Sequence, residues 1–154
     1  MEIRAALSTD AAAIAVLLRR SIAALCVADH RNDPAILAPW LANKTARTVA
    51  RWIADPANTL LVAADGAAIL SAGCVTSAGE VTLNYVSPDA RFSGVSRATM
   101  GALEAAARAR GHTRCGLEST ATAHRFYRAL GYVDTGPPKE KHGMATFPMM
   151  RRLA

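Results

Sequence analysis

The chain has 154 residues, of which 51% are hydrophobic, and it carries a formal net charge of +6 at pH 7. This length supports one domain with a core of its own, so we expect a single domain over residues 1–154. Aromatic residues make up only 5% of the chain and the arginines are not gathered in one run, which disfavours a nucleic-acid partner and favours a compact anionic ligand.

Neither a membrane segment nor a secretion signal is predicted. No stretch approaches about 18 uninterrupted apolar residues, and the N-terminus MEIRAALSTD lacks an apolar signal core. The three cysteines lie far apart, with neither a CxxC pair nor a histidine at metal-ligand spacing. We therefore expect a cytoplasmic protein with reduced thiols, no bound metal and no membrane partner.

The first third of the chain is helical in character. Residues 2–7, EIRAAL, suit a short first strand, and residues 8–29 supply capping residues followed by apolar residues at helical spacing. Residues 36–58, ILAPWLANKTARTVARWIADPAN, predict one or two shorter helices broken near Pro39. This region thus predicts one strand and then two helical segments.

From residue 59 the period changes to that of strands. Residues 59–64 and 67–78 predict a hairpin around Asp65 and Gly66, and EVTLNYV, residues 80–86, predicts a third strand. The clearest helix of the chain follows at residues 96–110, SRATMGALEAAARAR.

The last third alternates between the two periods. Residues 113–119 predict a strand, 120–130 a helix, and 132–136 and 144–153 the final strands, separated by the polar loop PPKEKH. The predicted order is β-α-α-β-β-β-α-β-α-β-β, which is a mixed α/β (α+β) domain.

One stretch between a strand and a helix could hold an anion: VSPDARFSGVSRATM, residues 86–100. Gly94 lets the backbone approach a ligand, Ser96 can cap the helix, and Arg91 and Arg97 add positive charge next to the helix N-terminus. An ordinary capped turn with solvated arginines explains the same residues, and alone it is the better interpretation. Neither GxGxxG nor a P-loop is present.

A second motif changes this balance. The chain resembles the GNAT superfamily of acyl-CoA-dependent N-acyltransferases in two stretches, YVSPDARFSGVSRATMGALEAAARARG followed by LESTATAHRFYRALGYVDTG. The patterns of that family are V-x-P, R/Q-x-x-G-x-G/A and A-x-x-F/L-Y-x-x-x-G-F/Y. The residues on the first two patterns are Val86, Pro88, Arg91, Gly94 and Ser96. Those on the third are Ala123, Phe126, Tyr127, Gly131 and Tyr132. The resemblance covers residues 58–135, and the N-terminal elements agree in order.

The resemblance implies a largely antiparallel central sheet flanked by helices, and acetyl-CoA as co-substrate. It implies that the pyrophosphate of coenzyme A lies on the loop at Gly94. The implied cofactor-binding residues are Val86, Arg91, Phe92, Ser93, Gly94, Val95, Ser96, Arg97, Thr120 and Phe126. The sequence departs from the family at Ser96, where a small residue is usual, and at Thr120, where many members carry asparagine.

The resemblance also makes Tyr127 the catalytic residue that we expect to protonate the departing thiolate. A tyrosine pKa near ~10 lies close to that of a thiol, ~8.5. Without the paired motifs, a core tyrosine would be the better interpretation. The general base stays unassigned, because residues 80–86 offer only Glu80 at the far end; Tyr85 is a candidate for the substrate pocket.

The loop after the first helix, CVADHRND, borders the acceptor site in the resembled fold. Asp29 and His30 could therefore bind the substrate amine, and Trp40 could line its pocket. A helix-ending turn with solvated side chains explains Asp29 and His30 equally well, and a core anchor explains Trp40.

These residues predict an N-acetyltransferase that transfers an acetyl group from acetyl-CoA to a primary amine by direct attack in a ternary complex. A non-catalytic acyl-CoA-binding regulatory module is the alternative, and a basic nucleic-acid-binding protein, suggested by charge alone, is a third hypothesis. The acceptor could be a small molecule or a peptide, and homodimer formation stays open.

Overall fold

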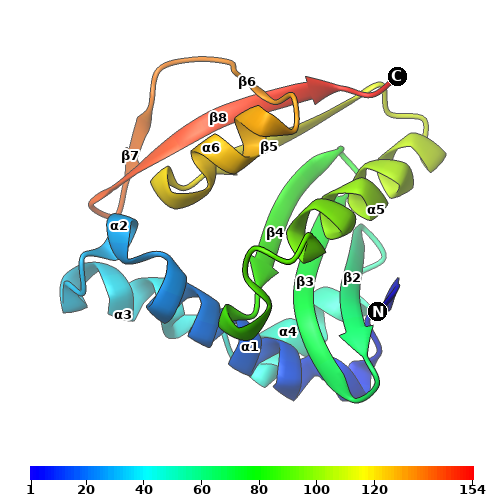
Figure 1. Ribbon diagram of the computed structural model, residues 1–154, viewed down its shortest axis with the longest axis horizontal. Helices are drawn as coiled ribbons and strands as arrows, with labels where there is room; N and C mark the ends of the chain where they lie inside the picture. The colour runs from blue at the N-terminus through cyan, green and yellow to red at the C-terminus, as the bar shows by residue number, and fades with distance from the viewer.

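The computed structural model describes all 154 residues, Met1 to Ala154. Eight strands form the sheet at its centre (Figure 1). The strands are β1 (Glu2–Ala5), β2 (Asn58–Asp65), β3 (Ala68–Thr76), β4 (Glu80–Val86), β5 (Arg114–Ser119), β6 (Val133–Asp134), β7 (Lys139–Lys141) and β8 (Met144–Arg152).

Six α-helices surround this sheet. They are α1 (Ala11–Leu25), α2 (Val27–His30), α3 (Pro34–Ala42), α4 (Ala46–Ala54), α5 (Val95–Ala109) and α6 (Ala121–Ala129). Short 3₁₀ turns lie at Ser8–Asp10 and Pro88–Ala90. No helix combines the length and the apolar character that crossing a bilayer requires.

The strand order is β1-β2-β3-β4-β5-β8-β6, with β7 pairing to β8 outside this path. All neighbouring strands are antiparallel except β4 and β5. These two pair only at Glu80–Gly116 and Val81–Leu117, and then diverge towards their C-terminal ends (Figure 1). The backbone groups of the later residues of β4 therefore have no partner on β5.

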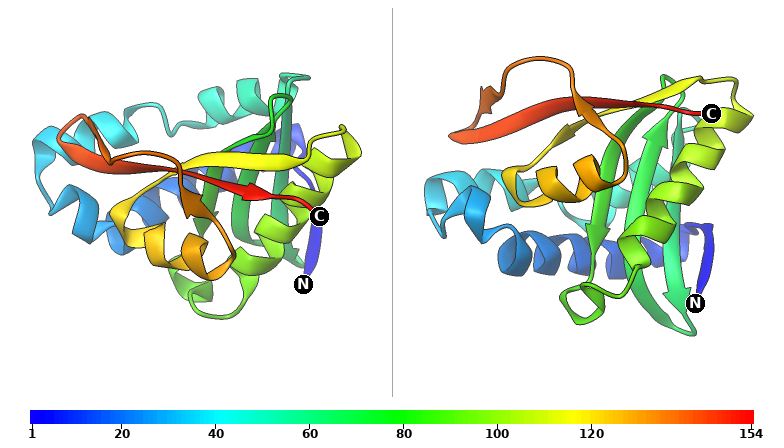
Figure 2. Two further views of the ribbon diagram at one scale, coloured as in Figure 1. Left: turned by 90° about the horizontal axis from the view of Figure 1, so that it is seen from above. Right: turned by 45° about the horizontal axis from the view of Figure 1, so that its top comes forward.

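Helices cover both faces of the sheet (Figure 2). On one face, α1 and α4 bury Ile14, Leu18 and Val49 against β2 and β3. On the other face, α5 and α6 share a core in which Leu103 and Tyr127 are buried. Burial of these apolar side chains between the sheet and the helices is the main source of the stability of the fold.

The position of α5 is fixed by small residues on β3. A Cβ at Gly73 would lie 2.8 Å from Leu103 Cδ1 and 2.9 Å from Thr99 Cγ2, so only glycine permits this close approach. The Thr99 hydroxyl donates to the Val95 carbonyl at 2.9 Å, and Ser71 in turn bonds Thr99 at 2.6 Å. The first turn of α5 is therefore anchored to the sheet.

The structure corrects two sequence expectations. The helical region does not break at Pro39, which lies inside α3; α3 ends at Ala42, and Thr45 caps α4 by accepting the Thr48 N–H at 3.2 Å. The segment predicted as the polar loop PPKEKH contains β7, because Lys139–Lys141 pairs with β8. Its exposed side chains lack the apolar alternation that predicts a strand. The observed order therefore has two more helices and one more strand than predicted.

Candidate active site

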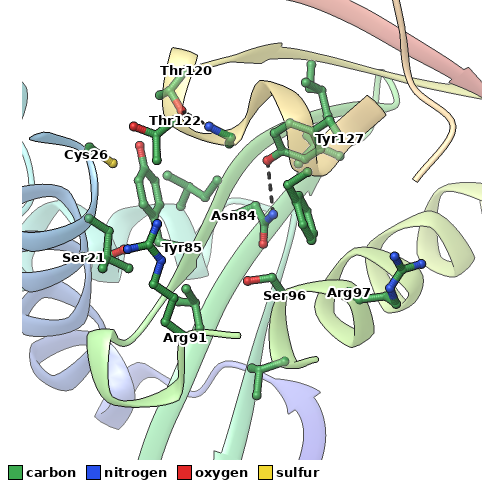
Figure 3. Close-up of a pocket in the computed structure, with 18 of the residues that line it drawn as sticks. Ser21, Cys26, Asn84, Tyr85, Arg91, Ser96, Arg97, Thr120, Thr122 and Tyr127 are labelled. Carbon is green, nitrogen blue, oxygen red and sulfur yellow. Dashed lines mark hydrogen bonds between the residues drawn. The ribbon is translucent and has the colours of Figure 1, made fainter. Parts of the chain in front are cut away.

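A cavity of about 460 Å³ lies where β4 and β5 diverge (Figure 3). It is bounded by the C-terminal part of α1, by β4 and β5, by the loop leading into α5, and by α6. Most of the residues predicted for cofactor binding and catalysis line it together. They are Val86, Arg91, Phe92, Gly94, Val95, Ser96, Arg97, Thr120, Phe126 and Tyr127.

The N-terminus of α5 opens into this cavity. Gly94 precedes the helix with φ +83° and ψ 0°, a left-handed conformation that favours glycine. The first backbone hydrogen bond of the helix runs from the Ala98 N–H to the Gly94 carbonyl at 3.1 Å, and the N–H groups of Val95, Ser96 and Arg97 have no partner within the chain. A Cβ at Gly94 would meet no atom within 4 Å. Unpaired donors facing open space at a helix N-terminus suit an anion.

Ser96 does not cap α5, so that expectation was wrong. Gly94 is the N-cap residue, no side chain bonds the free N–H groups, and Ser96 is the second residue of the helix. Its hydroxyl points towards the middle of the cavity instead (Figure 3). Because a side-chain cap would occupy an N–H group, its absence leaves the anion site open.

The two arginines of the loop differ in direction. Arg91 reaches across the cavity towards Tyr85, whereas Arg97 extends away from it (Figure 3). The Arg91 guanidinium lies 4.5 Å from the centroid of the Phe92 ring, which is 91% exposed at the mouth of the cavity. Ser93 is not among the lining residues, and its hydroxyl donates to the Ala90 carbonyl. Arg91 is therefore the side-chain cation that the loop directs inward.

Tyr127 is buried on α6 with its hydroxyl in the cavity. The Asn84 side-chain amide donates to the Tyr127 Oη at 3.1 Å (Figure 3). Burial raises the pKa of Tyr127 to about 12, and the hydrogen bond from Asn84 opposes this in part. Since the phenol oxygen accepts from Asn84, its own proton is free for a second partner. The Asn84 Oδ1 is buried and has no partner.

Comparison with known proteins identifies the family of this chain. A family model described as an acetyltransferase (GNAT) domain matches residues 27–153. The chain belongs to the GNAT acetyltransferase family. No curated protein sequence matches it.

Solved structures share the GNAT fold over nearly the whole chain. A GCN5-related N-acetyltransferase from Rhodopseudomonas palustris is 23% identical, with a TM-score of 0.86 and coverage of 99% of this chain and 95% of that one. PaiA N-acetyltransferase from Thermoplasma acidophilum, in complex with coenzyme A, is 14% identical, with a TM-score of 0.80 and coverage of 99% and 98%. The protein yncA from Salmonella typhimurium, with its cofactor acetyl-CoA, is 22% identical, with a TM-score of 0.69 and coverage of 100% and 94%.

These findings bear on the predictions directly. The family, the mixed α/β fold class and the enzyme class, an acetyltransferase, are confirmed. The predicted co-substrate agrees with the coenzyme A and acetyl-CoA in two of the neighbours. The roles of single residues still depend on the geometry of this GNAT chain.

Cys26 and Tyr85 bring two more titratable groups to the wall of the GNAT cavity. Burial raises the pKa of the Cys26 thiol to about 12, so it stays protonated and is a poor nucleophile. Burial also raises the pKa of Tyr85, an effect that the Trp40 side chain partly offsets. No group of three or more His, Cys, Asp or Glu side chains is placed to hold a metal ion.

Asp29, a predicted substrate residue, instead holds the start of α6. It is buried at 5% exposure, and its carboxylate accepts the Ala121 N–H at 2.7 Å, the Thr122 N–H at 3.2 Å and the Thr122 hydroxyl. Thr120 completes this helix start by accepting the Ala123 N–H at 3.1 Å. The Asp29 side chain does not line the cavity. The carboxylate therefore fixes the helix that carries Tyr127.

His30 and Trp40 also lie outside the cavity lining. His30 is completely buried, its Nε2–H donates to the Ile22 carbonyl at 3.0 Å, and its Nδ1 accepts the Asn32 N–H at 2.9 Å. Both ring nitrogens are thus occupied within the chain. Trp40 packs edge-on against this ring, with centroids 6.2 Å apart. Of the four predicted substrate residues, only Tyr85 lines the cavity.

Asn84 and Glu118 line the cavity but were not predicted as site residues. Asn84 is the hydrogen-bond partner of Tyr127. Glu118 is the one carboxylate in the lining. The alternation of β5 places Glu118 on the face opposite to the buried Cys115, Leu117 and Ser119, which is equally typical of a solvated residue, so the sequence carries no signal for its place in the cavity.

Proposed function

We propose that this GNAT chain transfers the acetyl group of acetyl-CoA to a primary amine by direct attack in a ternary complex. The observation that carries the proposal is that one cavity holds both an open anion site at α5 and a protonated phenol at Tyr127. A coenzyme A thioester needs both, since its pyrophosphate is anionic and its sulfur leaves as a thiolate. The acceptor is a small-molecule or peptide amine.

The loop and α5 supply the cofactor site in this proposal. The free N–H groups of Val95, Ser96 and Arg97 would bind the pyrophosphate, with the Arg91 guanidinium adding a full charge. Phe92 lies at the mouth, where its exposed ring could contact the remainder of coenzyme A. Thr120 and Phe126 would flank the arm that leads to the thioester.

The chemistry needs a carbon–nitrogen bond to form, a carbon–sulfur bond to break and a proton to reach the sulfur. Tyr127 is the hydrogen-bond donor that we propose for the departing sulfur, and the proton that the amine releases reaches the thiolate afterwards through solvent. Its pKa of about 12 exceeds that of a thiol, ~8.5, so complete transfer from Tyr127 to a free thiolate is uphill. We therefore expect Tyr127 to stabilise the developing thiolate by donating a hydrogen bond as the sulfur leaves.

The amine must lose a proton in the same reaction. Glu118 is the carboxylate that we propose to accept it, directly or through a water, because the lining holds no other carboxylate. The protonated thiol of Cys26 makes a covalent acyl-enzyme unfavourable, which supports direct attack.

Calorimetry and an acetyl-transfer assay test the proposal. Wild-type protein should bind acetyl-CoA, and Tyr127→Phe should lower kcat by about 100-fold or more with little change in acetyl-CoA affinity. Tyr132→Phe is the matched control, since Tyr132 lies outside the cavity lining and donates to Glu104 at 2.7 Å. Unchanged turnover in Tyr127→Phe would remove this residue from the mechanism. Acetyl-CoA binding without turnover of any amine would favour the regulatory module.

A further inference from the structure

A second cavity, of about 320 Å³, adjoins the first at β4. Both cavities are lined by Thr82 and Leu83. The pairing of β3 with β4 passes from Cys74–Leu83 to Val75–Val81 and so skips Thr82, which marks a bulge at this point. From Leu83 the second cavity extends to Trp52 on α4 and to the junction between α3 and α4. Its volume suits a small molecule.

Lys44, at that junction, is the unusual residue of this cavity. It is only 8% exposed, although Asn43 and Thr45 on either side are exposed. Its ammonium donates to the Asn43 Oδ1 at 2.7 Å, and no carboxylate lies within 4.0 Å of it. A buried ammonium with one neutral acceptor is unfavourable without a counter-ion. Burial, with the nearby charge of Lys141, accordingly lowers the pKa of Lys44.

The charge beside Lys44 comes from a distant part of the chain. The β7–β8 hairpin folds over α3, since a Cβ at Gly143 would lie 3.3 Å from Ile36 Cγ1. This packing carries Lys141, at the end of β7, towards Lys44. Lys139, at the start of β7, lies with its Nζ 3.5 Å from the Oε1 of Glu118 in an exposed contact. Glu118 lines the first cavity, which is the reaction cavity of the proposed function. The hairpin therefore brings Lys141 near Lys44 and Lys139 near Glu118, and only Lys139 has a carboxylate partner.

We infer that the second cavity is the acceptor site and that Lys44 is its specificity residue, binding a carboxylate or phosphate group of the amine substrate. The inference rests on the proposed function. An acceptor whose anionic group pairs with Lys44 would extend towards Thr82 and Leu83, where the two cavities adjoin, and its amine would enter the reaction cavity there. Such a site excludes polycationic amines, because Lys44 and Lys141 repel them.

Matched pairs of amines test this inference. The pairs are phenylalanine with phenethylamine, lysine with cadaverine, and O-phosphoethanolamine with ethanolamine. Each pair differs by one anionic group, and the third separates a phosphate from a carboxylate. Wild-type protein should acetylate the anionic member of at least one pair with a kcat/KM about 10- to 100-fold above that of its partner, the discrimination expected of a charge-assisted hydrogen bond.

Lys44→Met keeps the length of the side chain and removes a buried charge, so it should fold. It should abolish the preference within each pair, mainly through KM, and leave the calorimetric affinity for acetyl-CoA unchanged. Arg47→Met removes an exposed cation from α4 and is the matched control for net charge. It should keep the preference.

Two results would decide against the inference. They are a wild-type preference for the neutral or polycationic member, and an undiminished preference in Lys44→Met. Failure of wild-type protein to bind acetyl-CoA, or binding without turnover of any amine, would instead overturn the proposed function itself, so the two failures are distinguishable.

Discussion

Replacing Asp29 by alanine should destabilise the protein strongly, because this carboxylate ties α2 to the start of α6. Asp29 accepts three hydrogen bonds from Ala121 and Thr122, more than 90 residues along the chain. Removing it would leave two backbone N–H groups and a hydroxyl without their partner, at the positive end of the helix that carries Tyr127.

The size of the effect follows from these contacts. A hydrogen bond to a charged group contributes about 1.5 to 3 kcal/mol, and a carboxylate at a helix N-terminus adds about 0.3 to 1 kcal/mol. Three bonds to one carboxylate do not add in full, so we expect Asp29→Ala to lower the free energy of unfolding by about 3 to 5 kcal/mol. Asp29→Asn keeps one acceptor oxygen and should cost about 1 to 2 kcal/mol.

Urea unfolding at pH 7, followed by circular dichroism, measures these differences. The control is Asp33→Ala, which removes an exposed cap that accepts the Ala35 N–H at 2.9 Å and should cost about 1 kcal/mol. An unfolding free energy of Asp29→Ala within 1 kcal/mol of wild type, together with a raised KM for the acceptor amine, would refute this reasoning and favour direct contact with substrate.

Three further outcomes are expected. Gly94→Ala should weaken acetyl-CoA binding about 10-fold in calorimetry, since a side chain strains this left-handed position and intrudes on the anion site, whereas Gly101→Ala, within α5 and facing open space, should not. Glu104→Ala should lower the free energy of unfolding by about 3 to 5 kcal/mol in urea, because it leaves the buried Tyr132 hydroxyl and the Arg151 guanidinium unpaired. All three tyrosines have raised pKa values in the folded protein. Their contribution to the free energy of unfolding is therefore complete below pH 10, and above it the free energy of unfolding falls by up to about 4 kcal/mol per pH unit. Absorbance at 295 nm should therefore show tyrosine ionisation only together with alkaline unfolding, and ionisation in the folded state would contradict this.

The sequence predicted most of the residues that gather around the N-terminus of α5 in the cavity, because these signals are local. Gly94 and the helix after it stand within a few residues of each other, and a helix N-terminus behind a left-handed glycine presents free N–H groups wherever the rest of the chain lies. Tyr127, which also lines the cavity, was singled out because its motif is contiguous. Ser96 was misjudged on the same local scale: its residue type suits a cap, but the turn at Gly94 starts the helix two residues earlier.

Three of the four residues predicted to bind substrate lie outside the cavity lining, because their surroundings depend on partners far along the chain. Asp29 is polar and sits where a helix ends, which is typical of both a binding loop and a turn, and only the packing of α2 against α6 decides between them. Lys44 lies in the polar sequence NKT between two helices, where a lysine is usually solvated. It is buried where the junction between α3 and α4 meets β3 and β4, and the segment that brings Lys141 near it, β7, was itself expected to be a loop. When distant segments bury a charged residue, no periodic pattern in the sequence signals the burial. The energetic cost of burying the charge becomes evident only once the fold is known. That cost is the physical reason to test Lys44 first when the acceptor is sought.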